Sequence, residues 1–169
     1  MIIEVFFLLL PAALGNMVLS IFKKFRFFNT PVDFGSSFRG KRVFGDNKTW
    51  KGLVVGTLVA VLVVYLERMM GVFPGYEEYG FVVLGLVLGL GSLLGDLVES
   101  FVKRQFGRAP GTSWMPWDQI DWILGSLLLL SLLEPVGIGY WMYGILIYGA
   151  LHIVTNLIGY YCGVNKGKF

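Results

Sequence analysis

Long apolar stretches occupy most of this sequence, and they restrict the chain to folds that cross a lipid bilayer. A helix of about 20 mostly apolar residues spans the hydrocarbon core. Five stretches come close to this requirement, and they cover residues 2–22, 53–70, 79–97, 120–133 and 139–161. The fourth is the weakest, because Asp121 lies inside its start and Glu134 and Pro135 end it. The pattern predicts an all-α, polytopic membrane protein with five transmembrane helices.

Composition agrees with a membrane protein. The 169 residues are 56% hydrophobic, and the mean hydropathy is +0.70. A soluble domain of this size has too much surface to hide so many apolar side chains. We expect one integral membrane domain over residues 1–169. The single cysteine, Cys162, excludes an intramolecular disulfide and a Cys-based zinc site.

The basic residues predict how the chain is oriented in the bilayer. Thirteen of the 14 Lys and Arg residues fall in the first loop, in the loop after the third stretch, or in the tail. The positive-inside rule makes these segments, about 23–52, 98–119 and 162–169, cytoplasmic and puts the N-terminus outside. Glu4 stands where a signal peptide would be basic, so residues 2–22 are expected to remain as a helix. We therefore expect a multi-pass protein of the cell membrane whose active site faces the cytoplasm.

A charged stripe ends the third apolar stretch. Its members are Asp96, Glu99, Ser100, Lys103 and Arg104, at spacings that bring all five to one face of a helix. Ion pairs between residues four apart would explain part of this stripe without any function. A carboxylate at the end of an apolar run is nevertheless costly, and ionisable residues at membrane depth are functional candidates. The stripe suggests a site for a metal and a phosphate.

Two further carboxylates, Asp118 and Asp121, open the fourth stretch and share a helix face. With Asp96 they could hold Mg²⁺ through oxygen ligands. The alternative is that Asp118 caps the helix and that Asp121 is favoured by the helix dipole. Capping explains Asp121 less well, because apolar residues follow it at once.

A glycine-flanked segment, residues 45–52, precedes the second stretch and contains Lys48, Thr49, Trp50 and Lys51. Exposed N–H groups at a helix N-terminus suit a phosphate. The alternative is a membrane-surface anchor, with Trp50 at the interface and the lysines on anionic lipid. The sequence alone leaves both interpretations open.

Several other features carry weaker signals. His152 and Asn156 share a face of the last stretch, and such polar pairs often only hold helices together. Glycines at 85, 89, 91 and 95 on the third stretch favour close helix packing. The segment 29–42 could either fold over a nucleotide or only satisfy the positive-inside rule.

Taken together, these elements resemble the membrane CTP-dependent cytidylyltransferases that make CDP-activated lipids. The positions that match are Asp96, Glu99, Ser100, Lys103, Arg104, Asp118, Asp121, Lys48, Thr49 and Gly52. Gln119 stands where other members carry Arg, and the Lys-Asp and His-Gly-Gly elements of the bacterial signature are absent. These departures and the short chain resemble the compact archaeal branch, the CDP-archaeol synthases. Asn16, Thr30, Pro31, Asp33, His152 and Asn156 also look like that branch.

The resemblance implies transfer of CMP from CTP to 2,3-bis-O-geranylgeranylglycerol 1-phosphate, with release of pyrophosphate, in membrane lipid biosynthesis. It implies Mg²⁺ as cofactor, held by Asp96 and Asp121 with Asp118 and Glu99. Lys103 and Arg104 would act with the aspartates in catalysis. The residues implied for binding CTP or phosphate are Lys48, Thr49, Ser100, Lys103, Arg104 and Asn156. The partners implied are CTP, a lipid phosphate and the bilayer, with no nucleic acid.

Other functions remain open at this point. A CDP-diacylglycerol synthase or a CTP-dependent polyprenol kinase would use the same residues, because an apolar tail cleft has interchangeable side chains. A small transporter would place Asp96, Asp121, His152 and Asn156 along a pathway. The oligomeric state is not predicted by any of these patterns.

Overall fold

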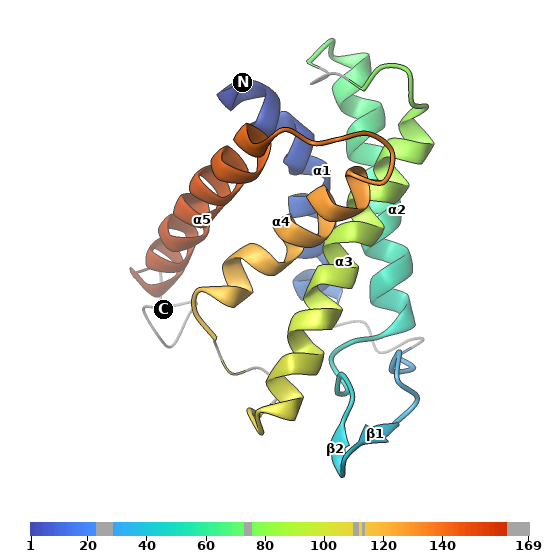
Figure 1. The fold of residues 1–169 in the computed structure, drawn as a ribbon, viewed down its shortest axis with the longest axis vertical. Helices are drawn as coiled ribbons and strands as arrows, with labels where there is room; N and C mark the ends of the chain where they lie inside the picture. Colours follow the sequence, from blue (N-terminus) through green and yellow to red (C-terminus); the bar gives the residue numbers. More distant parts are fainter. Residues whose placement is uncertain (23–28, 73–75, 110–111, 113, 162–169) are drawn as a thin grey trace.

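The computed structural model describes residues 1–22, 29–72, 76–109, 112 and 114–161, without the side chains of 20–22 and 156–161. Five helices and one short hairpin make up the fold (Figure 1). The elements are α1 (Ile2–Phe22), β1 (Ser37–Phe38), β2 (Lys41–Arg42), α2 (Trp50–Met69), α3 (Phe81–Gln105), α4 (Trp117–Leu130) and α5 (Ile138–Tyr161). The predicted all-α class therefore holds for the described residues, apart from the antiparallel hairpin β1–β2.

Four of the described helices, α1, α2, α3 and α5, are long and apolar enough to cross a membrane. Helix α4 has 14 residues, about 21 Å at 1.5 Å per residue, which is shorter than a hydrocarbon core of about 30 Å. The five-span count therefore remains a prediction. Helix α3 runs past the expected end at residue 97 to Gln105, so the charged stripe lies entirely on helix.

Helix α3 packs against α1, α2 and α4, and its glycines make this possible. A Cβ atom added at Gly85 or Gly89 would meet α2, at Val61 or Ala60. On another face, a Cβ at Gly91 would lie 2.7 Å from the Gly125 carbonyl oxygen of α4. The predicted close packing of these glycines is confirmed, and it brings α2 and α4 to opposite sides of the stripe.

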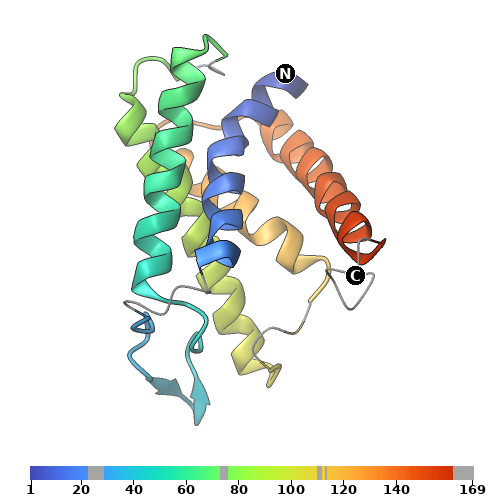
Figure 2. The ribbon, with the colours of Figure 1, turned by 180° about the vertical axis from the view of Figure 1, so that it is seen from behind.

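The core lies among α1, α3 and α4. Its fully buried members include Val5, Leu8 and Leu9 of α1, Leu84 and Leu88 of α3, and Ile123, Leu127 and Leu130 of α4. Viewed from behind, α1 lies between α2 and α5 (Figure 2). Helix α2 instead exposes Val54, Leu58 and Leu62 along one face. A continuous apolar face of this kind suits contact with lipid.

The segment between α1 and α2 folds onto the start of α2. The Val32 N–H donates to the Lys48 carbonyl (2.8 Å), and the Trp50 N–H donates to the Thr30 carbonyl (3.1 Å). The hairpin, the ends of α1 and α3, and the start of α2 lie at one end of the molecule (Figure 1). The N-terminus lies at the opposite end (Figure 2). The segment 29–42, whose role the sequence left open, is thus an ordered part of the charged end.

Asp33 holds this segment together. Its carboxylate accepts hydrogen bonds from the N–H groups of Phe44 (2.9 Å), Gly45 (3.1 Å) and Gly35 (3.0 Å) and from Arg42 (2.8 Å). Burial of Asp33 raises its pKa, but the hydrogen bonds outweigh burial and hold the pKa well below its usual range. The chain from 33 to 45 is therefore a closed loop anchored on one ionised carboxylate.

Candidate functional site

Three carboxylates from two helices meet at the charged end of α3. Asp96 and Glu99 come from α3 and Asp121 from α4, and each offers an oxygen within 4.8 Å of the others. Glycine explains how α4 comes this close, because a Cβ at Gly95 would collide with the Asp121 backbone. Carboxylate oxygens are the ligands that Mg²⁺ takes in proteins. The donor set therefore fits a hard divalent cation, as the sequence suggested for these three residues.

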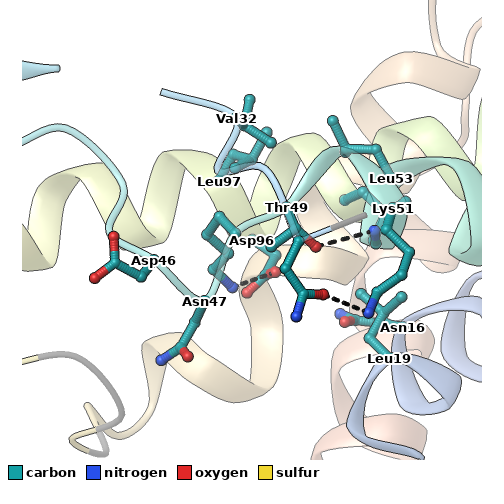
Figure 3. Close-up of a pocket in the computed structure, with 14 residues that line it drawn as sticks. Asn16, Leu19, Val32, Asp46, Asn47, Thr49, Lys51, Leu53, Asp96 and Leu97 are labelled. Atoms are coloured by element: carbon teal, nitrogen blue, oxygen red, sulfur yellow. Dashed lines mark hydrogen bonds and ion pairs between the residues drawn. The ribbon is translucent and has the colours of Figure 1, made fainter. Parts of the chain in front are cut away.

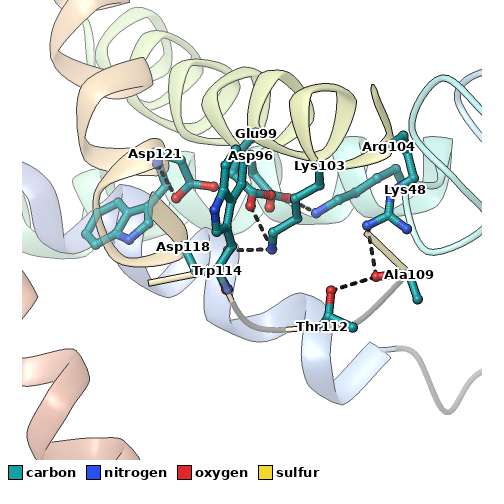
Figure 4. A network of polar contacts seen from close by, with 11 residues as sticks. Lys48, Asp96, Glu99, Lys103, Arg104, Ala109, Thr112, Trp114, Asp118 and Asp121 are labelled. Atoms are coloured by element: carbon teal, nitrogen blue, oxygen red, sulfur yellow. Dashed lines mark hydrogen bonds and ion pairs between the residues drawn. The ribbon is translucent and has the colours of Figure 1, made fainter. Parts of the chain in front are cut away.

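Two lysines border the carboxylate cluster (Figure 4). Lys48 forms an ion pair with Asp96. Lys103 lies 2.6 Å from Glu99 and also forms an ion pair with Asp118. The side chains of Lys103 and Glu99 are only 11% and 6% exposed, so this pair is shielded from water and stronger than a surface pair.

Asp118 lies beside the cluster and contacts it through Lys103. Its second oxygen accepts a hydrogen bond from the Trp114 N–H (2.7 Å). Helix α4 begins at Trp117, with Pro116 at the capping position. The alternative that Asp118 caps this helix is therefore wrong. Asp121 accepts from the Trp122 N–H (2.7 Å).

Arg104 and Ser100 are buried on the same face of α3. Arg104 is 7% exposed and Ser100 is 5% exposed. One Arg104 nitrogen donates to the Ala109 carbonyl (3.1 Å), and its Nε and Nη1 find no acceptor among the described residues. Buried donors without acceptors are costly, and a guanidinium is well shaped for phosphate oxygens. Arg104 can therefore accommodate an anionic ligand.

A cavity of about 370 Å³ opens on the α1–α2 side of Asp96 (Figure 3). Its polar lining includes Lys48, Thr49 and Lys51 at the start of α2, and asparagines from α1 and the loop. The Thr49 hydroxyl accepts from the Gly52 N–H (3.2 Å) and caps α2. The cavity lies within the size range of ligand pockets, roughly 300–1,000 Å³.

The structure brings together most of the residues suggested by the sequence. Asp96, Glu99, Asp121, Asp118, Lys103 and Lys48 form one connected network. His152 is half-buried on α5. Among the described residues no hydrogen bond or ion pair joins its side chain to this network, although the charge of Asp118 acts on it. The side chain of Asn156 lies outside the described residues.

Two residues of the cavity, Lys51 and Asn29, were not among the site residues predicted from the sequence. Lys51 is only 7% exposed, and its ammonium donates to the Asn29 side-chain oxygen (2.6 Å). The available signal for Lys51 was its place in the glycine-flanked segment at the start of the second apolar stretch. Asn29 gave no signal, because its contact with Lys51 depends on how the loop folds back.

Comparisons with known proteins identify the family of this chain. A family model described as CarS-like, CDP-archaeol synthase, matches residues 1–169. A CDP-archaeol synthase of Methanoculleus marisnigri is 35% identical, over 94% of this chain and 98% of the relative. Another, from Pyrobaculum islandicum, is 32% identical over 95% of both chains.

A solved structure is also similar. It is described as an intramembrane enzyme for archaeal membrane lipids biosynthesis, and it matches with a TM-score of 0.79 and 28% identity. The match covers 93% of this chain and 95% of that one. The chain belongs to the CDP-archaeol synthase family.

Proposed function

We propose that this protein transfers CMP from CTP to the phosphate of an isoprenoid glycerol ether lipid, 2,3-bis-O-geranylgeranylglycerol 1-phosphate. The observation that carries this proposal is one connected site at the charged end of α3. There a cluster of three carboxylates, Asp96, Glu99 and Asp121, is bordered by Lys48 and Lys103. Family membership supports the same reaction.

In this reaction an oxygen of the lipid phosphate attacks the α-phosphorus of CTP. A new P–O bond forms, the α–β phosphoanhydride bond breaks, and pyrophosphate leaves with the bonding electrons. Phosphoryl chemistry of this kind needs positioning and charge stabilisation more than covalent participation by the protein. Lys48 and Lys103 would neutralise phosphate charge, and Arg104 would offer paired donors to one phosphate group. Ser100, buried beside Arg104, would offer a further hydroxyl.

Asp96, Glu99 and Asp121 would hold Mg²⁺, and Asp118 would orient Lys103 from the other side. When bound, the ion would screen the charge of the triphosphate oxygens. Lys48 pairs with Asp96, and Lys103 with Glu99. With a cation on the carboxylates, both lysines would be available to bind phosphate oxygens.

We place this site at the cytoplasmic edge of the membrane, with five transmembrane helices and the N-terminus outside. CTP reaches the site from water, and the lipid tails remain in the bilayer. The position of the stripe at the end of a long apolar helix supports this arrangement. So does the gathering of basic residues at that end.

The test is an assay of the purified protein with radiolabelled CTP and Mg²⁺. It compares the isoprenoid ether phosphate with phosphatidic acid, which the alternative CDP-diacylglycerol synthase would use. We expect a labelled CDP-lipid and pyrophosphate with the ether lipid. Conversion of neither lipid, together with ion flux in liposomes containing the protein, would instead support the transporter alternative.

A further inference from the structure

Two aromatic side chains of the loop that Asp33 closes lie on the outside of the molecule. Phe34 is 71% exposed and Phe38 is 47% exposed. Burying a large ring is one of the strongest stabilising contributions available to a fold. Large apolar side chains that stay exposed on an ordered loop therefore indicate a contact with a membrane or another partner.

The backbone of this loop holds two of its exposed side chains in a conformation that glycine adopts more easily. Phe34 has φ +47° and Arg39 has φ +50°, both in the left-handed region. A bulky residue is uncommon there, whereas glycine has no Cβ to clash. Such strain persists mainly where the side chain itself is needed. The loop thus presents a phenyl ring and a guanidinium at a cost in backbone conformation.

Phe34 lies at the end of the apolar face of α2. Exposed side chains recur every four residues along this face, at Trp50, Val54, Leu58 and Leu62. The 20 residues of α2 extend over about 30 Å, the thickness of a hydrocarbon core. Trp50 at its first turn is where tryptophan is favoured, at the boundary between lipid and water. The Phe34 ring lies 6.2 Å from the Trp50 ring, so Phe34 lies at the same boundary.

Phe38 has the same relation to α3. The exposed face of α3 continues through Leu86, Leu90, Leu94 and Val98. Phe101 follows about one turn later, and its ring lies 5.9 Å from the Phe38 ring. The hairpin that carries Phe38 lies at the end of the molecule where α2 begins and α3 ends (Figure 1). Each of the two loop aromatics therefore extends the apolar face of a different helix.

The charges beside these rings are positive. The Arg39 guanidinium lies 5.4 Å above the centre of the Phe38 ring, and Lys41 donates to a backbone carbonyl at the end of α3. Both basic residues are exposed. Arg42 differs from them, because it forms ion pairs with two carboxylates. Basic side chains next to aromatic rings at a membrane boundary are complementary to anionic lipid head groups.

We propose that the 33–42 loop is a membrane-docking element that binds the anionic head groups of the bilayer. Phe34 and Phe38 enter the interface beside α2 and α3, and Arg39 and Lys41 contact lipid phosphates. The partner is the surrounding bilayer, and the docked loop does not enter the carboxylate cluster.

Docking would also set the depth of the neighbouring site. The Val32 N–H donates to the Lys48 carbonyl (2.8 Å), so the docked loop is joined directly to the segment that carries Lys48. Within that segment the side chains divide between two tasks. Lys48 and Lys51 contact the polar site, whereas Trp50 is 40% exposed beside Phe34. Both interpretations that the sequence allowed for residues 45–52 would then apply, to different side chains.

The test is a fluorescence measurement on the full chain in nanodiscs. A fluorophore is attached to Ser37→Cys, in a background with Cys162→Ser, and a fraction of the lipid carries a nitroxide quencher on its head group. We expect quenching in phosphatidylcholine and stronger quenching when an equal amount of phosphatidylglycerol is added. A basic residue near an anionic surface strengthens binding about fivefold. Arg39→Gln combined with Lys41→Gln should therefore remove the gain from phosphatidylglycerol.

Phe34→Asn tests the aromatic contact, because asparagine tolerates the left-handed backbone better than other non-glycine residues. It should reduce quenching in both lipid mixtures, and Phe38→Ser should do the same without altering that turn. Met70→Asn is the matched control. Met70 is 67% exposed at the far end of α2, so its replacement should leave the quenching unchanged.

Lys166→Gln combined with Lys168→Gln removes the same charge from the tail and should keep the gain from phosphatidylglycerol. Equal loss of this gain in the tail and loop variants would show a general charge effect and overturn the inference. Weak quenching of the wild type in both mixtures, or unchanged quenching in Phe34→Asn and Phe38→Ser, would also overturn it. The measurement needs neither CTP nor turnover, so its outcome is independent of the proposed reaction.

Discussion

The ammonium of Lys48 pairs with the carboxylate of Asp96, and this ion pair joins the loop before α2 to the first residue of the charged stripe on α3. Its position matters because Asp96 also belongs to the carboxylate cluster and lines the cavity. The pair thus lies at the junction between the proposed metal site and this cavity. Changes at this junction should affect chemistry more than folding.

Replacing Asp96 or Asp121 with Asn should abolish CMP transfer. Each substitution removes one charged oxygen ligand from the cluster, and the loss of even an outer partner of a metal site costs about 10–100-fold in activity. We expect at least that loss in a CTP incorporation assay, and a chelator should have the same effect on the wild type.

Glu78→Gln provides a comparison, because Glu78 is exposed at the opposite end of the molecule. It should keep wild-type turnover, and all three variants should elute from a sizing column as the wild type does. Near wild-type turnover in Asp96→Asn or Asp121→Asn would rule out the metal-ligand assignment.

Gly95→Ala should separate α3 from α4 and disturb the carboxylate cluster. The added Cβ would collide with the Asp121 backbone and lie 3.2 Å from the Gly125 Cα. Overpacking at such a contact typically costs about 1–3 kcal/mol, so we expect a lower Tm as well as lower activity. A thermal melt in detergent and the incorporation assay measure the two effects.

The matched substitution is Gly149→Ala on α5, where no atom lies within 4 Å of an added Cβ. Alanine is a better helix former than glycine by about 1 kcal/mol, so this variant should keep or raise the Tm. Equal Tm and equal activity in Gly95→Ala and Gly149→Ala would show that the close approach of α3 and α4 at Gly95 is not needed for stability or activity.

Much of this fold could be predicted from hydropathy alone. The bounds of α1 match the first predicted span, because a bilayer-length apolar run permits few alternatives. The extension of α3 to Gln105 could not be predicted from hydropathy, which falls where the charges begin. The stripe is nevertheless helical there, because Glu99 and Lys103 pair one turn apart and the stripe packs against α4.

The composition of the site could be predicted only in part. Helical spacing places Asp96 and Glu99 on one face, and this holds in any helix. The meeting of Asp96 with Asp121 depends on the glycine contact between two helices. The meeting of Lys51 with Asn29 depends on the fold of the loop. Such contacts between distant segments leave no periodic pattern in a single sequence.

Replacing Lys103 should change stability and activity in a different way from replacing one of the carboxylates. Lys103 contacts both Glu99 and Asp118, so Lys103→Met leaves the buried carboxylate of Glu99 and the partly buried carboxylate of Asp118 without the cation between them. We expect a loss of both stability and activity. Adding Asp118→Asn to Lys103→Met should recover part of the Tm but none of the activity, because it relieves repulsion without restoring a phosphate contact. Recovery of activity in the double variant would contradict a role for Lys103 in phosphate binding.

Asp33→Asn should loosen the loop that carries Lys48, and its effect should depend on pH. The pKa of Asp33 is held below its ordinary value of 3.8 in the folded protein, so the ionised carboxylate contributes stability above about pH 4. This contribution is lost as the pH falls through the lower, folded-state value. The Tm difference between wild type and Asp33→Asn should therefore be present at neutral pH and shrink below about pH 4. At neutral pH, trypsin should cut the variant faster at Arg39, Lys41 and Arg42.

Asp46→Asn is the control, because Asp46 pairs with the same arginine, Arg42, but its side chain is 81% exposed. Exposed ion pairs contribute about 0–1 kcal/mol to stability. A constant Tm difference across the pH range, or equal cutting of both variants, would show that Asp33 does not anchor the loop.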